Sequence, residues 1–113
     1  MTDDPDPGTV AGLLADDAAR TILEATAREP QSAAALREAC DVSGPTVYRR
    51  LEELEDAGLV VAETELDPDG DHYEVYTATL DRAVFDLQPD VVTCSVSRRE
   101  RLADRFTSVI EEM

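Results

Sequence analysis

Hydrophobic residues in the first third of the chain recur every three or four positions. This spacing predicts a helix over 10–29, because residues at that interval share one face. Asp16 or Asp17 can cap a restart within it, and Pro30 ends it. Residues 1–9 are polar and contain Asp and Pro, so we expect them to form a disordered lead-in.

Two further helices are predicted next, joined by a tight turn. Ser32 and Ser43 are suited to cap helices over 33–39 and 44–57, and Gly58 is the expected stop of the second. The polar residues of the longer helix point away from one apolar face, which is formed by Val47, Leu51 and Leu54.

The second half of the chain changes to strand-like patterns. Two β-prone runs, 59–66 and 73–80, flank a turn rich in Asp, Pro and Gly, which predicts a hairpin. A second hairpin is predicted over 83–96, because apolar residues alternate on both sides of the turn at 88–90. Each strand of this second hairpin offers one apolar face.

The chain ends in a predicted amphipathic helix. Ser97 and Glu100 match a capping box, which indicates where this helix begins. A narrow apolar seam on a polar helix is typical of a helix that pairs with another, so we expect a homodimer formed through this helix and the second hairpin. The seam consists of Leu102, Phe106, Val109, Ile110 and Met113.

The predicted fold class is α+β, a winged helix-turn-helix with an extra β-hairpin and a C-terminal dimerisation helix. With the segments 13–29 and 42–60 and the hairpin after them, the chain resembles the ArsR-related winged helix-turn-helix regulators, especially the small forms of halophilic archaea. The resemblance implies a DNA-binding domain over 10–80, followed by the hairpin and dimerisation helix over 81–113. It also implies that double-stranded DNA and a second copy of the chain are the partners.

The helix over 44–57 is the predicted recognition helix, and its N-terminal half would enter the major groove. Arg49 points furthest from the apolar face and can donate two hydrogen bonds to a guanine. The alternative is that Arg49 and Arg50 only pair with Glu53 or Glu52 on a solvated surface. The candidate DNA-binding residues are Ser43, Pro45, Thr46, Tyr48, Arg49 and Arg50.

Charge changes this picture. The chain has 26 Asp and Glu against 10 basic residues, all Arg, which gives a net charge of −16. This composition is typical of extreme halophiles, and it opposes binding to DNA. The wing, with Asp69, Gly70 and His72 at its turn, is acidic, so salt cations would have to bridge it to the duplex. The alternative function is therefore a winged-helix protein–protein interaction module that does not bind DNA.

Other classes of function lack support. No stretch approaches a signal peptide or a membrane span, so we expect a cytoplasmic protein with no membrane partner. Cys40 and Cys94 form no metal pattern and are read as small buried hydrophobic residues. We predict no metal, no cofactor and no enzymatic activity. One arginine cluster is either a second phosphate contact or an ion-pair shell around the dimer helices: Arg98, Arg99, Arg101 and Arg105.

Overall fold

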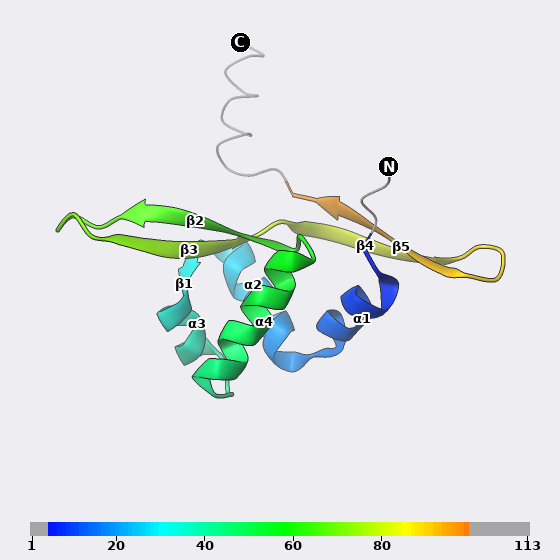
Figure 1. The fold of residues 1–113 in the computed structure, drawn as a ribbon, viewed down its shortest axis with the longest axis horizontal. Helices are drawn as coiled ribbons and strands as arrows, with labels where there is room; N and C mark the ends of the chain where they lie inside the picture. Colours follow the sequence, from blue (N-terminus) through cyan, green and yellow to red (C-terminus); the bar gives the residue numbers. More distant parts are fainter. Residues whose placement is uncertain (1–4, 100–113) are drawn as a thin grey trace, which may run out of the picture.

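The computed structural model describes residues 5–99, which form helices first and two β-hairpins afterwards (Figure 1). The hairpins extend in opposite directions, and the helices lie together on one side of them. The helices are α1 (Pro7–Ala15), α2 (Asp17–Arg28), α3 (Ala33–Ala39) and α4 (Gly44–Asp56). The strands are β1 (Gln31–Ser32), β2 (Val60–Leu66), β3 (His72–Ala78), β4 (Leu80–Leu87) and β5 (Val92–Arg98).

The strands form two separate antiparallel sheets. The first has the order β1-β3-β2, and its β2–β3 hairpin is the wing. The second contains β4 and β5, with Phe85 opposite Cys94 and Leu87 opposite Val92. Strand β1 pairs with β3 at Tyr76 and Val75. It was not predicted from the sequence, because two residues are too few to show an alternating pattern.

Each helix begins where a side chain caps it. Asp16 accepts a hydrogen bond from the N–H of Ala19 at 2.8 Å, which confirms a restart between α1 and α2. The predicted start at Val10 was wrong, because α1 begins at Pro7. Asp6 accepts from the N–H of Thr9 at 3.0 Å, and proline suits the first turn because it has no N–H to leave unpaired.

Helix α4 ends at Asp56 with Ala57 as its cap, and Gly58 is the predicted stop. Gly58 has a φ of +76°, which is a left-handed conformation that glycine adopts without strain. The N–H of Leu59 donates to the carbonyl of Leu54 at 2.8 Å, and the N–H of Gly58 donates to that of Glu55 at 3.0 Å. These are the two hydrogen bonds of a Schellman motif. The motif turns the chain directly from α4 into β2.

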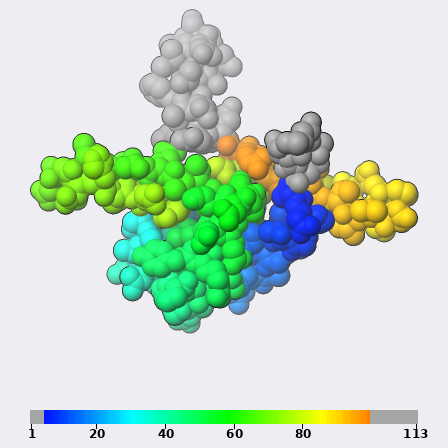
Figure 2. Space-filling model, in the orientation of Figure 1, coloured from blue at the N-terminus to red at the C-terminus, as the bar shows by residue number. Residues whose placement is uncertain are grey.

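The core lies between α2, α3, α4 and the base of the wing. The predicted apolar face of α4 is confirmed, because Val47, Leu51 and Leu54 are all buried. They belong to one cluster with other buried side chains from α2 and α3 and from the residues just after α4: Ile22, Leu36, Leu59 and Val60. The arrangement leaves the opposite face of α4 at the surface, where Figure 2 shows it as the front of the helical body.

A single residue, Thr79, joins the two hairpins. Its N–H donates to the carbonyl of Leu59 at 2.9 Å, and its hydroxyl donates to the carbonyl of Gly58 at 2.9 Å. The N–H of Arg99 donates to the carbonyl of Thr79 at 2.7 Å. The end of α4 and the end of β5 are therefore fixed to the same junction.

The second hairpin has the predicted alternation, but part of its apolar face is uncovered. Cys94 is 2% exposed beside the core, whereas Phe85 is 41% and Leu87 is 68% exposed. Ser97 was predicted to cap the C-terminal helix, which was wrong, because it pairs with Arg82 inside the sheet. The rest of that predicted helix, with its seam, lies outside the described residues.

The structure confirms the α+β winged helix-turn-helix fold with an extra hairpin. Among the helices described in residues 5–99, none combines the length and the apolar character that a membrane crossing requires.

Candidate nucleic-acid interface

The first turn of α4 presents polar groups at the surface. The Oγ of Ser43 accepts a hydrogen bond from the N–H of Thr46 at 3.4 Å, and the two hydroxyls lie 3.0 Å apart. Ser43, Pro45 and Tyr48 are exposed, and Thr46 is half-buried. The structure thus brings these four predicted residues together at one accessible end of α4.

Arg49 lies one turn further along α4 and is open to solvent. Its side chain is 63% exposed, and its Nε is 3.9 Å from Oε1 of Glu53. An exposed ion pair at that distance contributes little and breaks easily. The guanidinium of Arg49 is therefore available to a partner.

Arg50 is held by two carboxylates and has a different environment. Its Nε and Nη2 donate to Oδ2 and Oδ1 of Asp16 at 3.0 and 3.2 Å, and its Nη1 donates to Oε1 of Glu53 at 3.0 Å. Its side chain is 22% exposed. The fork between Arg50 and Asp16 lowers the pKa of that carboxyl and raises the pKa of the guanidinium. These contacts favour the ion-pair alternative for Arg50, and a phosphate contact stays a prediction.

Replacing Asp16 by Asn should lower stability by about 1 kcal/mol at neutral pH, because Asn still caps α2 but carries no charge. The folded pKa of Asp16 is depressed, so its contribution is complete above the unfolded value of about 3.9 and is lost as pH falls through the folded pKa. Urea unfolding of both proteins between pH 7 and pH 2 should show the difference shrink below about pH 4.

Asp17→Asn is the matched control, because its side chain is 95% exposed and, within residues 5–99, its carboxylate pairs only with Arg20. A stability difference for Asp16→Asn that stays constant across the pH series would mean that the ion pair with Arg50 contributes nothing.

The other half of α4 and the wing form an acidic surface. The hydroxyl of Tyr76, at the base of the wing, donates to Glu74 at 3.2 Å. The pKa of Tyr76 is raised, first by burial and then by the carboxylates of Glu74 and Glu55, which places acids from both elements around one phenol. Phosphates would be repelled here, so the start of α4 is electrostatically better suited to DNA than its second half or the wing.

The wing turn is exposed and closed by its own backbone. The N–H of Asp67 donates to the carbonyl of Asp71 at 2.7 Å, and the N–H of Gly70 donates to the carbonyl of Asp67 at 2.8 Å. Asp69, Gly70 and His72 are all exposed, at the far end of the hairpin from α4. Whether they meet DNA stays a prediction.

Sequence reasoning missed Arg37, which comes from α3 and lies against the start of α4. Its Nε is 3.0 Å from the position that a Cβ on Gly44 would occupy. The available signal was that α3, with the sequence AAALREA, has Arg37 as its single basic residue. The proximity of Arg37 to Gly44 could be recognised only from the three-dimensional structure.

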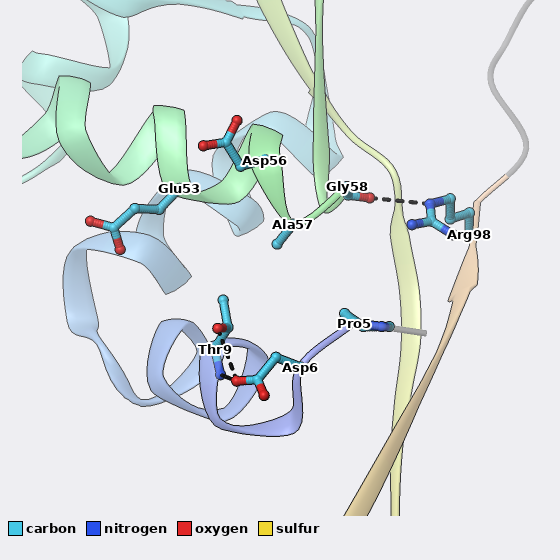
Figure 3. Close-up of a pocket in the computed structure, with 8 residues that line it drawn as sticks. All are labelled: Pro5, Asp6, Thr9, Glu53, Asp56, Ala57, Gly58 and Arg98. Atoms are coloured by element: carbon cyan, nitrogen blue, oxygen red, sulfur yellow. Dashed lines mark hydrogen bonds between the residues drawn. The ribbon is translucent and has the colours of Figure 1, made fainter. Parts of the chain in front are cut away.

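A cavity of about 420 Å³ lies at the opposite end of α4, between α1 and Arg98 (Figure 3). Its polar groups are turned outward or already bonded. The carboxylates of Glu53 and Asp56 point away from it, and Nε of Arg98 donates to the carbonyl of Gly58 at 3.2 Å. Arg98 thus braces the end of α4. Arg101 and Arg105 of the predicted basic cluster lie outside the described residues.

Both cysteines are buried, as predicted for small core residues. Burial raises the pKa of the Cys40 thiol, and the nearby carboxylate of Asp16 adds to the effect. A thiol with a raised pKa is a weak nucleophile at neutral pH.

Comparisons with known proteins agree with this geometry. Residues 14–62, from the end of α1 to the start of β2, match a family of helix-turn-helix domains. Among solved structures, an ArsR-like transcriptional regulator from Rhodococcus sp. RHA1 is similar, with a TM-score of 0.53 and 27% sequence identity. That similarity covers 63% of this chain and spans 61% of the other chain. No curated protein has a matching sequence.

Proposed function

We propose that this winged helix-turn-helix protein binds double-stranded DNA as a homodimer and regulates transcription in the cytoplasm, with residues 44–57 as the recognition helix. The observation that carries the proposal is the exposed polar start of α4, which lies inside the matched helix-turn-helix segment. The resemblance to an ArsR-like regulator supports the same class of function. The matched family is a DNA-binding type of domain and not an enzyme class.

Each residue of the interface has a proposed role. Arg49 donates to the edge of a guanine, because its guanidinium is exposed and only weakly paired. Ser43 and Thr46 donate their hydroxyls to phosphates or bases, and Pro45 and Tyr48 contact the groove wall. The acidic wing, with Asp69, Gly70 and His72, meets the backbone only through bridging salt cations.

The test is selection of bound duplexes from a random-sequence library, with the whole chain, in about 1 M KCl. The selected duplex and a scrambled one are then compared over a KCl series. We expect the selected duplex to bind more tightly, with a shallow dependence on salt, since few arginines can release counterions. If no sequence is enriched from the library at any KCl concentration, the proposed DNA-binding function is wrong.

The homodimer is supported by the uncovered end of the second hairpin. Two copies that are both strongly negative repel each other through their charged surfaces, and the face with Phe85 and Leu87 offers apolar contact instead. The predicted seam of Leu102, Phe106, Val109, Ile110 and Met113 would add to it. The exposed apolar residues on this face and at the hairpin turn are Phe85, Leu87, Val91 and Val92.

Replacing Leu87 by Asp should shift the protein from dimer to monomer, because a carboxylate buried in an apolar interface is unpaired. Sedimentation equilibrium in concentrated KCl measures this. Ser95→Asp is the control, since Ser95 is exposed and pairs with Val84, on the opposite face of the same hairpin. If both variants stay dimeric, the interface does not include the hairpin.

A halophilic origin predicts that salt stabilises the fold. The melting temperature should rise between about 0.1 M and about 1 M KCl, where the screening length falls from ~10 to ~3 Å. Replacing the exposed Glu24, Glu52 and Glu65 by Gln should reduce that rise. A melting temperature that is flat or falls with KCl would contradict the halophilic assignment.

The second candidate function is a protein–protein interaction module. It is favoured by one observation, the acidic surface shared by the wing and the second half of α4, which repels DNA. Failure of the duplex selection would make this function the better one.

A further inference from the structure

The arginines around the recognition helix differ in whether they are paired. Arg49 and Arg50 both lie within 4.0 Å of a carboxylate. Arg37, within the part of the chain that the structure describes, has no ion pair and no hydrogen bond. Arg28 and Arg82 are exposed and also lack such a partner among the described residues, so what distinguishes Arg37 is its position beside the start of α4.

Gly44 makes room for Arg37. A Cβ at residue 44 would lie 3.0 Å from Nε, 3.5 Å from Cζ and 3.6 Å from Nη2 of Arg37. Among the described residues, a positive φ occurs only at Gly58 and Gly70, so the backbone of Gly44 does not itself require glycine. Because glycine has no Cβ, the guanidinium of Arg37 can lie close to the first turn of α4 without a tight contact.

The location is unfavourable for a cation unless an anion joins it. The start of a helix carries partial positive charge, so a guanidinium there is repelled. Ser43 and Thr46, whose hydroxyls face the surface at the same turn, can donate further hydrogen bonds. Two positive sources and two hydroxyls therefore converge where a polyanion would lie.

We propose that Arg37, and not Arg50, supplies the phosphate contact that positions the recognition helix on DNA. This inference rests on the proposed DNA-binding function. Arg50 is committed to Asp16 and Glu53, and using it would break both contacts. Arg37 gives up no protein partner, so a charge-assisted hydrogen bond to a phosphate oxygen breaks no existing contact.

The experiment measures Arg37→Gln in the whole chain on the selected and the scrambled duplex over the same KCl series. We expect about tenfold weaker binding to both duplexes, as for loss of one charged hydrogen bond. The selected-to-scrambled ratio should not change, and the salt slope should fall by about one. Arg28→Gln is the control, because Arg28 at the end of α2 is an exposed arginine with the same charge change.

Gly44→Ala provides a second variant that keeps the charge and requires Nε of Arg37 to shift slightly away from the first turn of α4. It should weaken binding to both duplexes by less than Arg37→Gln does, and have no further effect when combined with Arg37→Gln. Thermal melting of both variants shows that they fold. Equal affinities for Arg37→Gln and Arg28→Gln, with wild type still binding, would overturn the inference alone. Absence of binding by wild type would overturn the proposed function and this inference with it.

Discussion

Replacing Leu54 by Ala should lower the free energy of unfolding by about 2–5 kcal/mol, the usual range for a leucine truncated in a close-packed core. Leu54 is 0% exposed and belongs to the cluster that joins α4 to α2 and α3. Its carbonyl also accepts the hydrogen bond that ends α4. Urea unfolding in concentrated KCl, where the wild type is best screened, measures the loss.

Glu52→Ala is the control on the same helix, because Glu52 is exposed and its loss should change stability by less than about 0.5 kcal/mol. Similar values for the two variants would mean that α4 is not held by its apolar face. Helix α4 would then need another anchor.

Arg49→Ala should cost about 1–3 kcal/mol on the selected duplex and much less on a scrambled one, because a bidentate contact to guanine discriminates between bases. Selection with the variant should lose preference at one guanine. The measurement is the selected-to-scrambled affinity ratio. It separates Arg49 from Arg37, whose loss should leave the ratio unchanged.

Arg82→Ala is the matched control, since Arg82 is an exposed arginine on β4, outside the matched segment. A ratio that is the same for Arg49→Ala and wild type would show that Arg49 does not read bases. If Arg50→Ala lowers the melting temperature and also weakens binding, the weaker binding results from loss of the ion pair with Asp16 and not from loss of a DNA contact.

The helices were predictable from sequence because their determinants are local. Asp16 and Ser43 each cap a helix through the N–H of the residue three positions on. The apolar period of α4 needs no knowledge of its partners. The predicted start of the first helix was wrong, although its cap is also local. The overlooked signal was Asp6, which caps the helix at the N–H of Thr9, followed by Pro7 in the first turn.

What the sequence could not predict depends on residues that are distant along the chain or on competition between local patterns. Asp16 and Arg50 are 34 positions apart, and no spacing rule connects them. The proximity of Arg37 to Gly44 depends on the angle between two helices. Ser97 had a valid capping pattern, but pairing with Arg82 in the second hairpin prevailed.

The junction at Thr79 has an evolutionary consequence. Strands β3 and β4 follow one another with this single residue between them, and alternate residues of a strand face opposite sides. An inserted or deleted codon at this point would exchange the two faces of the second hairpin relative to the wing. Phe85 and Leu87 would then exchange places with Val84 and Asp86. Gene lineages of this protein should therefore tolerate length changes in both hairpin turns and almost none at residue 79.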